Sequence, residues 1–208
     1  MIYDGSILIG TKLEEGFVQL ITNPKDLGIQ RSEDDYLFRT RKYLHHVLAG
    51  DGSRPYCPFV ELIEENNGYH IRNFPEHPSG IGFDVIVNIL GARFKLLSPR
   101  ETYRNQPVDI TTVVAAFAHP YAMSEEFCSQ IDEARNHYRQ DFLDQGLMIA
   151  QMHPHHQLGG VGKKSSDDPL YVSGIPLLMV RRMHQPDNVF MKLPREIEAY
   201  MKYFGGLK

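Results

Sequence analysis

The fold is decided by residues 108–154, which read VDITTVVAAFAHPYAMSEEFCSQIDEARNHYRQDFLDQGLMIAQMHP. The run 108–118 is almost wholly apolar and rich in β-branched residues, which is typical of a strand buried on both faces. Ser124 then caps an amphipathic helix that ends at Gly146, and residues 147–152 form a second apolar strand. This strand-helix-strand order predicts two parallel strands joined by a right-handed crossover.

The flanking sequence predicts further elements around this unit. Residues 81–97 carry apolar residues at helical spacing but also many β-branched residues. The pattern is therefore compatible with a helix or a strand, and we favour the helix. The other predicted elements are strands at 69–75 and 175–183 and helices at 32–49 and 194–204.

The length of 208 residues suits one domain with its own core. We predict a single α+β or α/β domain over residues 1–208, with helices packed on a mixed sheet of about five strands. In this domain, residues 1–31 form a hairpin or arm, residues 55–191 the core, and residues 194–204 a terminal helix.

Composition excludes several classes of function. Lys and Arg number 22 against 26 Asp and Glu, so the net charge of −4 gives no positive field for nucleic acid or an anionic membrane. The 2 cysteines cannot form a disulfide framework, and the start of the chain lacks the cationic region of a signal peptide. We expect a cytoplasmic protein that binds neither nucleic acid nor membrane.

Two histidines follow the two predicted parallel strands. His119 comes after the first strand and His153 after the second, and the carboxyl ends of parallel strands share an edge. Ligands bind at that edge in open α/β sheets, where the helix start at Ser124 favours an anion. We therefore predict that both histidines serve as acid-base groups or ligands, with Arg181 as an anion clamp. The alternative for each histidine is a satisfied polar residue.

His155 adds a possible metal site to this edge. Residues 153 and 155 would share one face of a strand, and His119 would complete a three-nitrogen set of the kind that zinc uses in catalysis. No acidic partner for these histidines is fixed by the sequence. A histidine-rich loop without metal is the favoured alternative.

Cys57 is the remaining candidate for chemistry. It precedes Pro58, which suits the first position of a helix, so the thiol would lie at a helix N-terminus. That position favours the thiolate and a role as nucleophile or ligand, including a haem ligand. A buried, inert thiol is the alternative for Cys57, and it is the prediction for Cys128 inside the helix.

Two similarities to known motifs are weak. Residues 159–164 resemble a phosphate-binding loop but lack its first glycine, its Ser or Thr, and the following helix pattern. Residues 153–158 faintly resemble the histidine-triad nucleotide-binding proteins, although His155 and His156 are adjacent and break the expected alternation. The second similarity is kept as a minor alternative.

A more extensive resemblance covers residues 55–191. The chain resembles a group of bacterial domains of unknown function marked by Cys-Pro-Phe, then Phe-His-Pro after a helix, then a Ser-Pro-x-Pro strand ending in Arg. The matching segments are Cys57-Pro58-Phe59, Met152-His153-Pro154, and Ser173-Gly174-Ile175-Pro176 leading to Arg181. Met152 and Gly174 depart from the pattern. The resemblance implies an accessory enzyme of a small-molecule pathway.

The functional prediction is an enzyme acting on a small anionic metabolite, with a site built from Cys57, His119, His153 and Arg181. The alternative is a non-catalytic module that binds a ligand or protein through its 8 Met and 22 Phe and Tyr residues. A haem- or metal-dependent redox enzyme is a minor alternative, since no cofactor is favoured. A homodimer that pairs through the terminal segments is a further possibility.

Overall fold

The computed structural model describes residues 17–20, 40, 63, 68–75, 82–97, 111–155 and 175–205. Its strands are β1 (Val18–Leu20), β2 (Tyr69–Asn73), β3 (Thr112–Ala116), β4 (Leu147–Met152) and β5 (Leu177–Arg182). Its α-helices are α3 (Phe83–Leu97), α4 (Glu125–Asp144) and α6 (Pro194–Phe204). Two short 3-10 helices are η5 (Pro120–Met123) and η6 (Gln185–Phe190).

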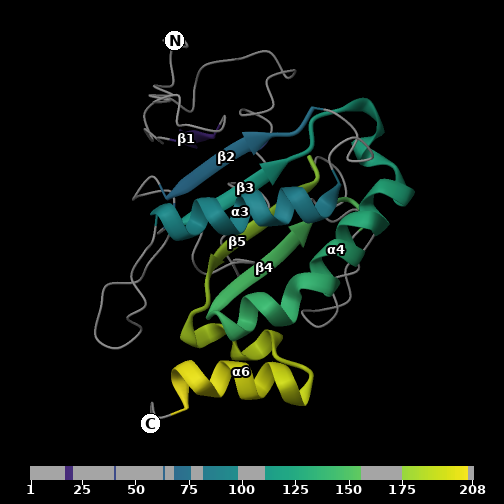
Figure 1. Cartoon of the computed structure of the whole chain (residues 1–208). Coiled ribbons are helices and arrows are strands. Elements are labelled where there is room, and N and C mark those ends of the chain that lie inside the picture. The colour runs from purple at the N-terminus through teal and green to yellow at the C-terminus, as the bar shows by residue number, and fades with distance from the viewer. Residues whose placement is uncertain are drawn as a thin grey trace, which may run out of the picture.

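The strands form one mixed five-stranded sheet in the order β1-β2-β3-β5-β4. β2 and β3 are parallel, whereas β5 is antiparallel to both of its neighbours, β3 and β4. β3 and β4 therefore run in the same direction with β5 between them (Figure 1). The predicted α+β class and the parallel strand-helix-strand unit at 108–154 are confirmed.

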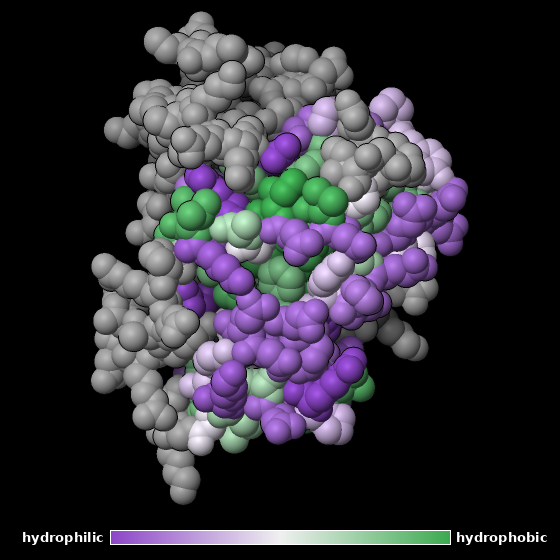
Figure 2. All heavy atoms as spheres, in the orientation of Figure 1, coloured by the Kyte–Doolittle hydropathy of each residue, from purple (hydrophilic) through white to green (hydrophobic). Residues whose placement is uncertain are grey.

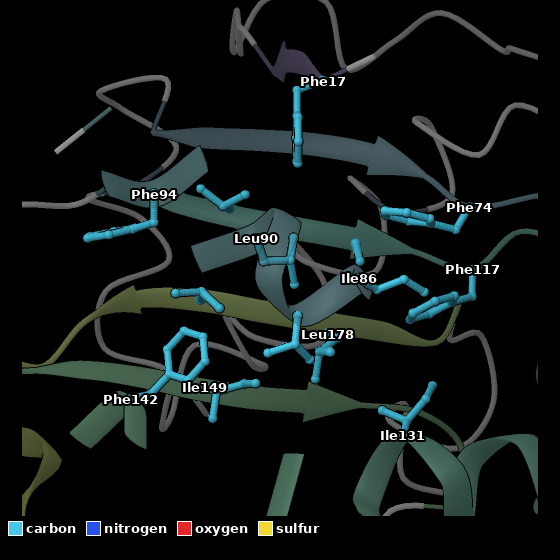
Figure 3. Packing of buried hydrophobic residues seen from close by; sticks show 14 of the residues in the cluster. Phe17, Phe74, Ile86, Leu90, Phe94, Phe117, Ile131, Phe142, Ile149 and Leu178 are labelled. Atoms are coloured by element: carbon cyan, nitrogen blue, oxygen red, sulfur yellow. The ribbon is translucent and has the colours of Figure 1, made fainter. Parts of the chain in front are cut away.

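Helices α3 and α4 lie on the same face of this sheet (Figure 1). Every second residue of β3 faces the two helices. The side chains of the strand and of the helices meet in the main core (Figure 3). All residues of β3 are buried, as predicted for a strand without a solvent-facing side. The core residues that Figure 3 labels are Phe17, Phe74, Ile86, Leu90, Phe94, Phe117, Ile131, Phe142, Ile149 and Leu178.

Residues 83–97 form the helix that the sequence favoured over a strand. The buried stripe includes Ile86, Leu90 and Phe94, at the spacing of one helix face. Val85 and Leu96 lie outside this stripe and are 46% and 69% exposed. Figure 2 shows hydrophobic residues at the surface beside α3 and mainly hydrophilic residues over α4.

Helix α4 begins and ends as its sequence predicts. Ser124 is its N-cap, and the Ser124 hydroxyl oxygen accepts a hydrogen bond from the backbone N–H of Phe127 at 3.1 Å. Gly146 follows the helix with a φ of 72°, a left-handed conformation that glycine adopts without strain. The chain can therefore turn directly from α4 into β4, which packs against it.

The C-terminal segment attaches to α4 through a buried ion pair. Arg139 of α4 donates from Nε to the carboxylate of Glu196 in α6, and its Nη2 donates to the carbonyl of Phe190 at 2.7 Å. Glu196 also accepts hydrogen bonds from the backbone N–H groups of Lys192 and Leu193, at 2.8 and 3.1 Å. A second apolar cluster packs beside the pair and comprises Leu143, Met148, Met183, Ala199 and Phe204.

Several predictions fall largely outside the described residues. The predicted arm at 1–31 contributes the described strand β1, and the predicted helix at 32–49 contributes one described residue, Thr40. The expected helix start at Cys57 and the loop at 159–164 lie outside the described part of the chain.

Candidate functional site

The candidate site lies at the end of the sheet where β2, β3 and β4 have their carboxyl ends, and this end is called the edge below. The strand registers align Asn73 with Ala116, and Leu177 of β5 lies between Ala116 and Met152. His119 follows β3 and His153 follows β4, so both histidines lie at this edge. Because β5 separates β3 from β4, the two strand ends are about 10 Å apart.

His153 forms a pair with a carboxylate of α4. The His153 imidazole is fully buried, and its Nε2 lies 3.0 Å from Asp132 Oδ1. The same Asp132 oxygen accepts a hydrogen bond from Gln151 Nε2 at 2.8 Å. The Asp132 side chain remains 34% exposed, so it is the solvent-facing member of the pair. An imidazole beside a carboxylate is a recurrent arrangement in proton transfer.

Asp132 is the residue that the sequence analysis missed. It lies one position after Ile131, which belongs to the buried stripe of α4. An acidic residue next to the buried stripe is the only signal in the sequence, since the contact depends on how α4 packs on β4. The missing acidic partner of the histidines is therefore supplied by the helix and not by a neighbouring loop.

His119 lies beside the same edge in a half-buried position. Its ring meets the ring of Phe127 edge-on, with centroids 4.8 Å apart and planes at 88°. Its carbonyl accepts a hydrogen bond from the N–H of Ala122 at 3.0 Å, which forms the η5 turn. The η5 turn therefore sets the position of His119 relative to α4.

The start of α4 carries acidic side chains that oppose the anion expected there. Ser124 already satisfies one N–H group, and the exposed first turn carries Glu125 and Glu126. Glu126 accepts a hydrogen bond from the hydroxyl of Tyr121. Negative side chains at a helix N-terminus neutralise its attraction for anions.

Arg181 does not lie with the histidines, which corrects the predicted site. It pairs in register with Thr112 at the start of β3, at the opposite edge of the sheet. The reason is that β5 is antiparallel to β3 and β4, so its carboxyl end points the other way. Arg181 instead donates two hydrogen bonds to buried Asp187, at 2.8 and 2.6 Å. This bidentate pair fixes η6 and leaves Arg181 a structural role.

The described residues contain no group of three or more His, Cys, Asp or Glu side chains that could hold a metal ion. The three-histidine set of His119, His153 and His155 therefore has no support from the geometry. Strand β4 ends at Met152, so residues 153 and 155 do not share a strand face as expected. His155 Nε2 lies 3.1 Å from the carbonyl oxygen of Met123.

Cys128 lies beneath the site and is fully buried. Its Sγ is 3.5 Å from the carbonyl oxygen of Ala122, which can accept from the thiol. Burial, followed by the charge of Asp132, raises the pKa of the Cys128 thiol to about 12. The thiol is thus kept protonated, in agreement with its prediction as inert.

This burial predicts slow thiol chemistry. In a Cys57→Ala variant Cys128 is the remaining cysteine of the chain. We expect the folded variant to react with DTNB at pH 8 at least about 100-fold more slowly than a free thiol, because little thiolate is present. The same variant unfolded in guanidinium chloride should react at the rate of a free thiol. Rapid reaction of the folded variant would contradict this description of Cys128.

Together these features define an α+β protein with a histidine-carboxylate pair at one edge of a mixed sheet. The chain belongs to the family described as "Domain of unknown function (DUF6875)", which matches residues 36–207. This match confirms the predicted kinship with an uncharacterised group of domains. Neither a curated protein nor a solved structure matches the chain. Among the described helices, none has the length and apolar character needed to cross a membrane.

Proposed function

We propose that this protein is an enzyme that transfers protons on a small anionic metabolite at the edge formed by His119, Asp132 and His153. The observation that carries the proposal is the pairing of His153 Nε2 with Asp132 Oδ1 at 3.0 Å. Asp132 is 34% exposed, so its carboxylate is the group that a metabolite can reach directly. His119 is half-buried with its Nε2 buried, so a metabolite would meet it through the rest of its ring.

Asp132 and His119 would exchange protons with the metabolite, and His153 would act as a positioning residue. With Nε2 protonated, the buried imidazole donates to Asp132, as does the Gln151 amide. These two donors hold the carboxylate in one orientation. A protonated His119 would attract the carboxylate or phosphate group of the metabolite, which is the basis for expecting an anion.

Binding is the first step of the test. Carboxylic acids and phosphate monoesters would be added singly to protein with 13C-labelled histidine rings, and the ring resonances recorded by NMR. We expect a ligand of this site to shift the His119 and His153 signals in a saturable way. His137 is exposed on the outer side of α4 and serves as the internal control. Equal shifts of all histidines, or none with any compound, would contradict the proposal.

Turnover is the second step and separates an enzyme from a binding module. Each bound compound would be incubated with wild-type protein, with Asp132→Asn, and with His137→Gln as the matched control. Mass spectrometry, or deuterium uptake from D2O for a proton exchange, would follow the compound. The proposal expects change with wild type and His137→Gln, and a loss of at least about 100-fold with Asp132→Asn. Binding without turnover would favour the module.

The non-catalytic binding module has one observation in its favour. Five large apolar side chains of the C-terminal segment are 38–67% exposed: Val189, Phe190, Leu193, Ile197 and Met201. Leu193, the N-cap of α6, and Ile197 and Met201 within the helix recur every four residues and so form one stripe along it. Pairing of two chains through this stripe would be seen as a dimer by light scattering that Ile197→Lys converts to a monomer. A monomeric wild type would remove this possibility.

The redox alternative depends on Cys57 and on histidine ligands for a metal or haem. Cys57 lies outside the described residues, and the described histidines belong to no group of three metal donors. An absorption spectrum with elemental analysis of the purified protein tests this alternative directly. A Soret band lost in Cys57→Ala or His153→Ala would establish haem and replace the proton-transfer proposal.

A further inference from the structure

A second group of polar side chains lies between β2 and α3, away from the candidate site. His70 and Arg72 alternate along β2 and share the face covered by α3, from which Arg93 projects. The guanidinium carbons of Arg72 and Arg93 lie 5.9 and 5.7 Å from the centroid of the Phe17 ring. Figure 3 shows Phe17 beside β2, at the β1 side of the core. Two cations thus share one buried ring.

Arg93 is buried and has no ionic partner among the described residues. Its exposed fraction is 8%, and its buried Nε has no hydrogen-bond acceptor in the described part of the chain. In the described part of the chain no carboxylate pairs with it. Buried arginines are rarely found without a paired anion, because transferring an unpaired charge out of water is costly.

His70, which lies on β2 beneath α3, is a second buried polar residue in this group. It is 7% exposed, and its buried Nδ1 also has no hydrogen-bond partner within the described ranges. Burial, followed by the charge of Arg93, lowers the pKa of His70 to about 4. His70 is therefore neutral at pH 7, and the positive charge here belongs to Arg72 and Arg93.

We propose that Arg93, Arg72 and His70 bind an oxyanion, which is the carboxylate or phosphate group of a small ligand. A guanidinium presents N–H groups in a fork that matches both kinds of oxyanion, and a neutral imidazole adds one further donor. Arg72 is only half-buried, so solvent reaches this site. The oxyanion would supply the negative charge that the described residues around Arg93 lack.

This oxyanion site is distinct from the edge that holds Asp132. His70 pairs in register with Val113 near the start of β3, whereas His119 lies beyond the end of that strand. Each of the two proposals can therefore be refuted without affecting the other.

The test uses inorganic phosphate and succinate as two separate probes, with calorimetric titration at constant ionic strength. At least one of them should bind wild-type protein saturably, and the tighter probe identifies the preferred oxyanion. Arg93→Met should raise the Kd at least about 10-fold, the loss expected for a charged hydrogen bond. Lys95→Met is the matched control, because Lys95 is an exposed cation on the same helix. Its Kd should stay within about 2-fold of wild type.

Arg72→Met provides a second variant at a less buried position and should also raise the Kd. Thermal melting without added anion checks folding, and Arg93→Met should melt no lower than wild type because it removes a buried unpaired charge. No binding of either probe by wild type would overturn the proposal. Equal losses in Arg93→Met and Lys95→Met would also overturn it, by showing attraction to net charge alone.

Discussion

Replacement of Arg139 by Met is expected to lower the free energy of unfolding by about 3 to 5 kcal/mol. The guanidinium and the Glu196 carboxylate are both at least nine-tenths buried on their side chains, 10% and 6% exposed. Removing the arginine leaves the carboxylate buried without its cation, and it also leaves the Phe190 carbonyl without a donor. Urea denaturation followed by circular dichroism measures this loss.

The matched controls separate charge from packing. Arg195→Met removes an exposed arginine of α6 and should change the stability by no more than about 0.5 kcal/mol. Arg139→Met combined with Glu196→Gln removes both charges but keeps an acceptor for the backbone N–H groups of Lys192 and Leu193. That double variant should recover more than about half of the loss. If the double variant is as unstable as Arg139→Met, the buried charge is not the cause.

The same pair predicts an acid-sensitive contribution to stability. Burial alone would raise the pKa of Glu196, but the hydrogen bonds from Arg139, Lys192 and Leu193 outweigh it and lower the pKa to about 2. A carboxylate whose pKa is lowered on folding stabilises the fold above its unfolded pKa. That stabilisation should therefore decline as the pH falls from about 4.5 to about 2. Glu196→Gln should flatten this part of the stability profile.

Local sequence patterns were sufficient to predict most of the elements of the fold. The helix at 125–144 has an N-cap at Ser124, a glycine at its end, and an apolar stripe, and each signal acts within a few residues. The strands on either side are mostly apolar, and most of their residues are buried. The direction of β3 and β4 then followed from the helix between them, because one helix returns the chain to the same end of the sheet.

The position of β5 could not be predicted in this way, and the error in the site came from it. Pairing of β5 between β3 and β4 is a contact between residues distant in sequence, so its direction does not follow from local patterns. An antiparallel β5 carries Arg181 away from His119 and His153. Asp132 was missed for a related reason, since its approach to His153 depends on the packing of α4 against β4.

Replacement of Phe127 by Ala is expected to cost about 3 to 5 kcal/mol of unfolding free energy. Phe127 is fully buried at the first turn of α4, and its ring lies 5.3 Å from that of Phe117 and 5.8 Å from that of Phe83. Those two rings belong to the end of β3 and the start of α3. Loss of the Phe127 ring therefore opens a cavity where three elements of the core meet.

Phe127→Leu is the matched control for this cavity, since it keeps most of the apolar volume and should cost less than about half as much. Phe190→Ala removes a ring that is 38% exposed and should cost less than either. Because the Phe127 ring also packs edge-on against His119, Phe127→Ala should move the ring resonance of His119 while leaving that of exposed His137 unchanged. A large loss of stability with an unmoved His119 resonance would mean that the core and the candidate site are independent. A large loss of stability together with a moved His119 resonance would mean that the aromatic core holds the half-buried histidine at the edge where Asp132 meets solvent.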